Sequence, residues 1–450
     1  MTRSKIKDSE ISMTSGSILK NIFLFSIPLV FTNLLQVLFN TVDVAVIGQF
    51  AGSLSLGAVG STPNLIFMFT GLLIGLSAGA NVIVAYHLGA KDQKSVDSAV
   101  HTSFLLSLFS GILIMILGIV FGRLILSAMH TKDILLDKAV LYFRIYMVGL
   151  PALSLYNFGN AIFSAVGDTK RPLLFLAIAG AVNVVLDLFF IVNLKMDVMG
   201  AALATVIAQY ISAFLIIFYL VKGIHGIKLQ LKHIRVDKNK LFTLIKIGVP
   251  AGFQNVIFGF ANIFVQVGVN SFDPIMVSGT AASANVDPLI YNVMSAFYVA
   301  GATFIGQNFG ANNKKRVLKS YYISMAMAFF IALFMGLILF FFGSYVLRIF
   351  TNDSSVIECG LHRVKIMAFS YCVSALMDGT IAACRGLGKT LVPSVIVFLG
   401  SCVFRIVWIY TIFAFYNTIE SLFSLYIFSW AITAVVEMFY FYVQLKKQMK

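Results

Sequence analysis

Charged residues are scarce in this chain. They make up 11% of its 450 residues, against about 25% in a soluble domain, while 59% of the residues are hydrophobic. This balance excludes a typical water-soluble fold. The apolar residues fall into twelve runs, each close to the roughly 20 residues that a helix needs to cross a bilayer. We predict spans at 21–47, 57–82, 98–121, 135–163, 172–194, 199–221, 242–269, 275–305, 318–343, 357–384, 391–415 and 421–444.

Proline is also rare, with eight residues in the whole chain. The fourth run, 135–163, contains one of them and is the weakest of the twelve, because Lys138 and Arg144 interrupt it. We expect Pro151 to kink this span, since proline breaks the hydrogen-bond pattern of a helix.

Motifs for catalysis and for metal or nucleotide binding are missing too. The six His residues form no HExxH pair and no Walker A sequence occurs, so we expect neither an enzyme nor a cofactor. The polar first 17 residues, with no cleavage motif after the first apolar run, predict no cleaved signal peptide. The four cysteines lack metal-ligand spacing and a disulfide framework, and we interpret them as small core residues: Cys359, Cys372, Cys384 and Cys402.

Positive charge is abundant but unevenly distributed. The net charge is +15. With the N-terminus in the cytosol, 24 Lys and Arg residues fall on the cytosolic side and 7 on the outer side. This bias is the positive-inside pattern of membrane proteins, so we expect both termini in the cytosol and no nucleic-acid partner. The basic stretch 222–246 is then a loop beside anionic lipid. The outer set is Arg123, Lys132, Lys138, Lys195, Arg348, Arg363 and Lys365.

The chain also repeats itself. Short motifs recur in the same order at an offset of 221 or 222 residues, such as Pro28 with Pro250 and Asn40 with Asn262. Six spans per half is an even number, so the halves have the same orientation and form a parallel repeat, as in transporters that work by alternating access. We predict an all-α membrane protein of two six-helix bundles. Its expected parts are a cytosolic segment 1–20, a first lobe 21–221, a basic linker 222–241, a second lobe 242–445 and a cytosolic tail 446–450.

Acidic residues inside spans are costly, and they usually mark ion or substrate paths. Asp43 follows Pro28 by 15 residues, and Asp187 follows Pro172 by 15 residues. At 1.5 Å per residue, both aspartates lie about 22 Å above their prolines, in the outer half of the membrane. Thr205, early in the inward-running sixth span, falls at the same level.

Two amides extend this set of oxygen atoms. Asn183 lies one turn before Asp187, and Asn40 lies three residues before Asp43, each on the same helix face as its aspartate. The group could bind Na⁺ through oxygen ligands, and it could equally pass protons, because two close carboxylates do not both ionise readily. The second half carries Val265 and Trp408 at the positions that match the two aspartates, so we expect coupling in the first half only.

The second half has ionisable residues of its own. Asp287 and Arg405 each follow a proline by about 18 Å of helix, which puts both near mid-membrane and suggests that they form a buried ion pair. Asp378 and Glu437 lie nearer the cytosol and are weaker candidates.

The chain contains a series of short motifs in a fixed order: GSILKNIFLFSIPLV, NTVDVAVIGQFAGSLSLGAVG, HLGAKD, GDTKRP, NVVLDLFFI, GAALATVIAQ, GQNFGANN and RGLGKTLVP. Taken together, these motifs resemble the multidrug and toxic compound extrusion family, from about residue 15 to 445. The family implies two six-helix lobes and a cation site made by an Asp on the first helix, an Asn and an Asp on the fifth and a Thr on the sixth. Asp43, Asn183, Asp187 and Thr205 match that pattern, whereas Gln254 is uncharged where some members have a carboxylate.

The resemblance implies a monomeric antiporter in the cell membrane. It would export amphipathic, mostly cationic drugs or metabolites in exchange for Na⁺ or H⁺, and so confer resistance to antibiotics. The main alternative is a flippase or exporter of a lipid-linked or other amphipathic metabolite. Such proteins often have 14 spans and basic residues in the cavity, whereas this chain has 12 predicted spans.

Overall fold

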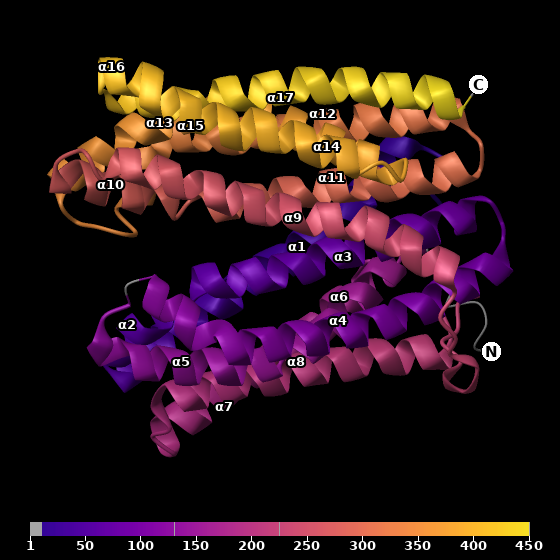
Figure 1. Ribbon diagram of the computed structural model, residues 1–450, viewed down its shortest axis with the longest axis horizontal. Helices are drawn as coiled ribbons and strands as arrows, with labels where there is room; N and C mark the ends of the chain where they lie inside the picture. The colour runs from indigo at the N-terminus through magenta and orange to yellow at the C-terminus, as the bar shows by residue number, and fades with distance from the viewer. Residues whose placement is uncertain (1–10, 130, 225, 450) are drawn as a thin grey trace. The chain divides into compact units, whose positions relative to one another are not determined.

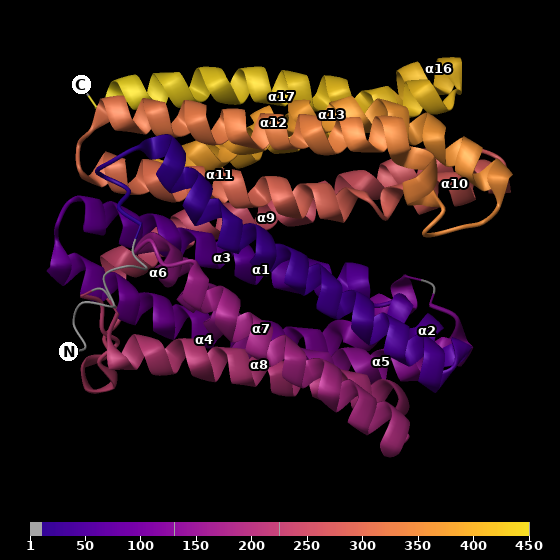
Figure 2. The same ribbon diagram turned by 180° about the vertical axis from the view of Figure 1, so that it is seen from behind.

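The computed structural model of the protein describes residues 11–129, 131–224 and 226–449, and helices dominate these residues (Figures 1 and 2). No strand occurs in the described residues. The cytosolic candidates Arg3, Lys5, Lys7 and Lys450 lie outside them. The α-helices are α1 (Ile18–Val46), α2 (Ser53–Gly60), α3 (Pro63–Gly89), α4 (Gln93–Ala128), α5 (Asp133–Val148), α6 (Leu150–Ala165), α7 (Lys170–Asp187), α8 (Asp197–Lys222), α9 (Lys238–Val269), α10 (Pro274–Ala284), α11 (Asp287–Gly310), α12 (Lys314–Leu347), α13 (Ser354–Gly386), α14 (Leu391–Val397), α15 (Phe404–Trp408), α16 (Ala414–Tyr416) and α17 (Ile419–Gln448).

The expected number of membrane spans is confirmed. Eleven helices of the described residues are long and apolar enough to cross a bilayer, and the bent pair α5 and α6 makes twelve. This pair bends by 46° at Gly149, next to Pro151, where the kink was predicted. Large apolar side chains such as Phe214, Phe341 and Phe439 are exposed, as lipid-facing residues are.

The second span of each half also consists of two helices. The second span of the first half breaks between α2 and α3, and the matching span of the second half breaks between α10 and α11. Pro63 and Pro288 lie in the first turns of α3 and α11, where a missing backbone N–H costs nothing. Each proline therefore starts a new helix after a short turn.

The described residues form two compact units. Of the described residues, unit 1 contains 11–12 and Phe31–Phe253, and unit 2 contains Met13–Val30 and 254–449. The changes of unit within α1 and α9 follow Pro28 and Pro250, which lie inside these helices. The start of α9 lies close against α3 of unit 1, because Gly248 has no side chain at the contact. A Cβ on Gly248 would lie 2.7 Å from the Cα of Leu76 in α3. The units therefore change inside α1 and α9, whereas the predicted lobes begin near the starts of these helices, at residues 21 and 242.

Each unit is packed around central helices. In unit 1, α6 packs against α3, α4 and α8. In unit 2, α13 packs against α10, α11, α12 and α17. Side chains that reach the centre of either unit are therefore surrounded by protein rather than lipid, which is the place where polar groups can be satisfied inside a membrane.

The repeat is visible in matching turns. Lys91 and Asn312 have φ of 58° and 54°, the left-handed region, at positions 221 residues apart. The next residues, Asp92 and Asn313, accept hydrogen bonds from the backbone N–H groups of Ser95 and Arg316 and so cap α4 and α12. The bonds from Ser95 also hold the pKa of Asp92 below its usual range. The same local structure thus starts the third span of both halves.

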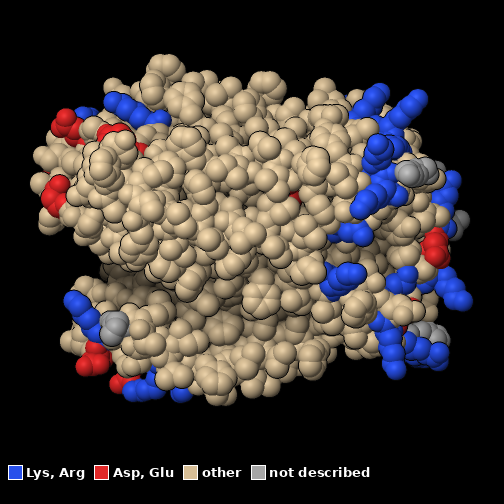
Figure 3. All heavy atoms as spheres, turned by 45° about the horizontal axis from the view of Figure 1, so that its top comes forward, with Lys and Arg blue, Asp and Glu red and all other residues tan. Residues whose placement is uncertain are grey.

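Charged side chains lie at the helix ends. On the face that Figure 3 shows, Lys and Arg side chains gather at one end of the helices and are almost absent from the apolar middle. Arg363 departs from its predicted place in an outer loop, because it lies inside α13 and is buried.

Candidate cation site in the first half

Three helices of unit 1 bring four of the predicted residues together. Asp43 lies on α1, Asn183 and Asp187 lie on α7, and Thr205 lies on α8. The Thr205 hydroxyl donates to Oδ2 of Asp43 at 3.2 Å, and Nδ2 of Asn183 donates to Oδ2 of Asp187 at 3.4 Å. The two carboxyl groups lie close enough to interact electrostatically.

Local features of the chain allow this approach. Gly180 lies on α7 one turn before Asn183, and a Cβ there would overlap the ring of Phe39 on α1. The absence of a side chain at residue 180 therefore lets α1 come close to α7 one turn before Asp43. Wide π-helical turns follow both aspartates, η2 (Ile47–Ala51) after α1 and η3 (Leu188–Asn193) after α7, and such turns are frequent at functional sites.

Both aspartates of this cluster are buried, so their negative charges are costly unless they are compensated. Asp43 is 6% exposed and Asp187 is 0% exposed. One oxygen of each carboxyl group, Oδ1, has no hydrogen-bond donor in the described residues, and neither group forms an ion pair there with Lys or Arg. Lys138, one of the predicted outer lysines, contacts Asp197 at 2.5 Å. Two buried carboxyl groups without a basic partner call for a proton or a small cation.

The donor set suits a monovalent ion. It offers carboxylate, amide and hydroxyl oxygens, which are hard ligands. In the part of the chain that the structure describes, no group of three His, Cys, Asp or Glu side chains could hold a metal ion.

The structure leaves Asn40 outside the hydrogen bonds of the cluster. Its side chain is exposed, and no hydrogen bond joins it to Asp43 or Asp187 in the described residues. Spacing along α1 put Asn40 near the face of Asp43, but three residues correspond to 300° of rotation, which is enough to turn a short side chain away. Tyr142 was not predicted, yet it is buried close enough to both aspartates to act on them electrostatically.

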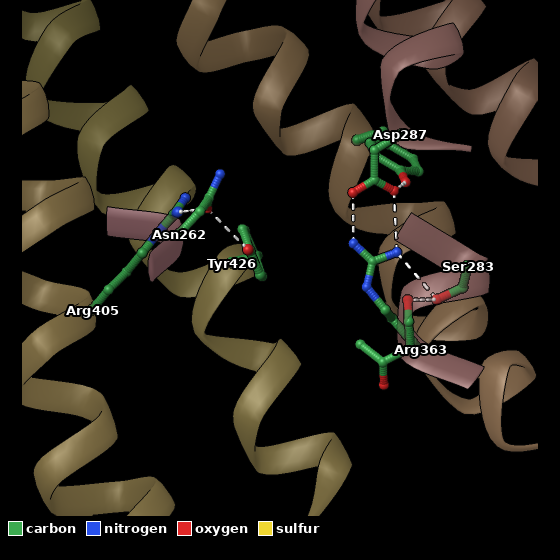
Figure 4. A network of polar contacts seen from close by, with 8 residues as sticks. Asn262, Ser283, Asp287, Arg363, Arg405 and Tyr426 are labelled. Carbon is green, nitrogen blue, oxygen red and sulfur yellow. Dashed lines mark hydrogen bonds and ion pairs between the residues drawn. The ribbon is translucent and has the colours of Figure 1, made fainter. Parts of the chain in front are cut away.

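The expected Asp287–Arg405 pair in the second half is wrong. Asp287 instead pairs with Arg363 through two hydrogen bonds of 3.1 and 2.5 Å, and the hydroxyl of Tyr371 donates to the same carboxylate at 2.5 Å (Figure 4). Asp287 begins α11 right after the helix break, so its side chain faces α13 rather than α15. The signal that could have found this pair was Arg363 itself, which was assigned to an outer loop although it lay within the predicted span 357–384.

The remaining candidates of the second half make local contacts. Arg405 donates to Oδ1 of Asn262 at 2.9 Å. Asp378 accepts a hydrogen bond from Ser374 at 2.9 Å, one turn away on α13. Glu437 is buried, and Cys384 lies 3.9 Å from one of its oxygens. Each acid therefore has its own neighbours, and these residues form no second cluster of carboxylates.

Apolar helices repeated in two halves, with an acidic pair buried in one of them, define a membrane transporter. The MatE family matches residues 28–189 and again residues 250–411, so the two matches start and end 222 residues apart. The chain belongs to this family, and the predicted repeat is confirmed. It is a bacterial-type efflux transporter of the multidrug and toxic compound extrusion family, and it is not an enzyme.

Curated relatives match along most of the chain. The probable multidrug resistance protein YpnP of Bacillus subtilis is 29% identical over 389 residues, which cover 86% of this chain and 87% of the relative. The probable multidrug resistance protein NorM of Thermotoga maritima is 26% identical over 393 residues, which cover 85% and 82%.

Solved structures agree with the fold. A MOP superfamily transporter from Pyrococcus furiosus, for which a binding pocket of reverse polarity suggests a different function, superposes with a TM-score of 0.91 at 22% identity and covers 98% of this chain and 99% of its own. An outward-facing multidrug resistance MATE transporter superposes with the same TM-score, identity and coverage. At this identity the likenesses establish the fold alone.

Proposed function

We propose that this protein is a secondary antiporter that exports amphipathic, mostly cationic drugs or metabolites in exchange for Na⁺ or H⁺. The observation that carries the proposal is the buried pair Asp43 and Asp187, which has no basic partner in the described residues. The names of YpnP and NorM as multidrug resistance proteins support the substrate class.

The coupling follows from what the two carboxyl groups need. With a cation or proton between them, α1 and α7 can stay close, and without it the two negative charges repel. Loading of Asp43 and Asp187 from outside therefore changes the packing of the first lobe and favours release of substrate to the outside. Unloading to the cytosol restores the other arrangement. Cation and substrate compete because they prefer different states of the protein.

We also propose that the chain acts as a monomer in the cell membrane with both termini in the cytosol. The charge difference supports this orientation, because 24 Lys and Arg residues fall on the cytosolic side against 7 on the outer side, or 6 without the buried Arg363. The predicted lobes 21–221 and 242–445 then have parallel orientations, as alternating access between repeats requires.

Asparagine variants test the proposal in cells. Asp43→Asn and Asp187→Asn should each abolish dye efflux while the protein still accumulates in the membrane, because neither variant can hold the cation or exchange the proton. Asp137→Asn is the matched control, since this acid of unit 1 is 81% exposed. Unchanged efflux in both site variants would exclude this coupling site. If the wild type also shows no efflux of a cationic dye, the result would favour an amphipathic, lipid-linked substrate.

A further inference from the structure

The repeat identifies a counterpart of the cation site in unit 2. At offsets of 221 and 222, Asn262 matches Asn40, Tyr426 matches Thr205, and Arg405 falls within one residue of the match to Asn183. These three side chains also meet in space. Arg405 and Tyr426 both donate hydrogen bonds to Oδ1 of Asn262, at 2.9 and 3.1 Å (Figure 4). Arg405 and Tyr426 thus correspond to two members of the first-half cluster, Asn183 and Thr205, whereas Asn262 corresponds to Asn40, which lies outside the hydrogen bonds of that cluster.

The guanidinium of Arg405 is surrounded by amide and hydroxyl oxygens and by aromatic rings. Arg405 is 1% exposed. Its carbon Cζ is 4.4 Å from the ring centre of Tyr426 and 5.8 Å from that of Trp430, and Nε is 3.5 Å from the hydroxyl of Ser429. Amide and hydroxyl oxygens together with aromatic faces are the groups that hold a free organic cation in a protein site.

No carboxylate neutralises this guanidinium directly. Arg405 forms no ion pair in the described residues, because Asp287 is engaged by Arg363 and Asp378 contacts Ser374. Asp378 is near enough to interact with Arg405 electrostatically, but without a hydrogen bond between them. A positive charge that is buried without a paired acid is costly, so a purely structural role would be served more cheaply by an apolar residue.

We propose that Arg405 is a fixed cation that takes, in the second half, the place that the coupling cation takes in the first. The second half then stays in the cation-bound arrangement through the cycle, and only Asp43 and Asp187 exchange an ion with the solution. This inference rests on the proposed function, and it explains why Val265 and Trp408 can replace the two aspartates there.

Chemical rescue tests whether the charge itself is needed. Arg405→Ala removes the guanidinium and should lower gradient-driven dye efflux about tenfold or more, because the second half loses its cation. Guanidinium chloride at millimolar concentration should restore efflux in a saturable manner. Urea has nearly the same shape without the charge and should restore nothing. Saturable rescue by guanidinium alone supports the proposal, and wild-type efflux in Arg405→Ala without any addition overturns it, as does equal rescue by urea.

A second pair of variants covers the case in which Arg405→Ala does not accumulate. Arg405→Lys keeps the charge and Arg405→Met keeps only the length, so the lysine variant should transport and the methionine variant should not. Equal efflux in both would overturn the proposal. The reference measurement, made in the same preparation, compares gradient-driven efflux of the wild type with that of Asp187→Asn, which should show none. Failure of that reference would contradict the proposed function, whereas failure of the Arg405 comparison alone would contradict only this inference.

Discussion

The aspartates Asp43, Asp187 and Asp287 lie inside membrane-spanning helices and differ in their neighbours, and therefore in what they can do. Asp287 is paired with Arg363, so its charge is already compensated. Asp43 and Asp187 have neutral donors and each other. A compensated carboxylate holds helices together, while an uncompensated pair can take up a proton or a cation. All three residues are aspartates, so the residue type does not distinguish these roles. The groups that each carboxylate contacts do distinguish them.

Thr205 offers a measure of how the site holds its ion. Its hydroxyl is shared between Asp43 and the carbonyl of Ala201, at 3.2 and 3.0 Å, so it can turn its oxygen toward an incoming cation. Thr205→Val keeps the shape and loses the oxygen, which should raise the cation concentration for half-maximal efflux about three- to tenfold. Thr205→Ser is the control and should stay near wild type. Equal values for all three proteins would remove Thr205 from the site.

The Asp287–Arg363 pair makes a prediction about stability. Asp287→Asn leaves the Arg363 guanidinium buried without its counter-ion and should lower the free energy of unfolding by about 3–5 kcal/mol, seen as a lower melting temperature in detergent. The exchange of Asp287→Arg with Arg363→Asp should recover part of the loss. The exchange of Asp287→Arg with Arg405→Asp should recover none, and recovery there would restore the pairing that the structure contradicts.

The first-half cluster could be predicted from the sequence, and the second-half pair could not. Helical rise puts Asp43, Asp187 and Thr205 at one depth because their helices continue without a break up to these residues. The same arithmetic failed for Asp287, because the break before α11 changes the direction of its side chain. Depth along a helix is set by residue number, but the face that a side chain takes depends on such breaks.

At the scale of helices, close approach decides which side chains meet. A Cβ on Gly279 of α10 would lie 2.6 Å from the backbone nitrogen of Gly360 on α13. The two backbones therefore touch one turn before Ser283 and Arg363 on the same helices. The hydrogen bonds between α10–α11 and α13 depend on this contact.

Adding one methyl group tests the contact between α10 and α13. Gly279→Ala should destabilise unit 2 by about 1–3 kcal/mol, because backbone atoms cannot move aside as a flexible side chain can. Gly259→Ala on α9 is the control, since a Cβ there has no atom within 4 Å. That variant should be neutral or gain up to about 1 kcal/mol through helix propensity. Similar melting temperatures for both variants would argue against tight packing at Gly279.

Span positions were predictable because apolar length is a strong signal, whereas the internal breaks were not. Pro63 and Pro288 begin new helices inside the second and eighth spans, yet Pro28 and Pro250 remain inside α1 and α9. The presence of a proline therefore does not predict whether a helix ends there, because the surrounding packing decides whether the helix continues beyond the proline.

For the whole molecule, the repeat and the charge distribution define an orientation that can be measured. In a protein whose native cysteines are replaced, Lys132→Cys should react with a membrane-impermeant maleimide in intact cells. Lys232→Cys should react only after permeabilisation, because the positive-inside pattern places it in the cytosol. Both lysines are exposed, so access to reagent depends on the side of the membrane. The reverse labelling pattern would invert the proposed topology and the direction of transport.

Coupled export through Asp43 and Asp187 is most directly tested with purified protein in liposomes. Efflux of an ethidium-type dye is followed while a sodium gradient and a proton gradient are imposed separately, for wild type, Asp187→Asn and the exposed control Asp137→Asn. We expect wild type and Asp137→Asn to respond to one of the two gradients and Asp187→Asn to respond to neither. Gradient-driven efflux that persists in Asp187→Asn would contradict the account.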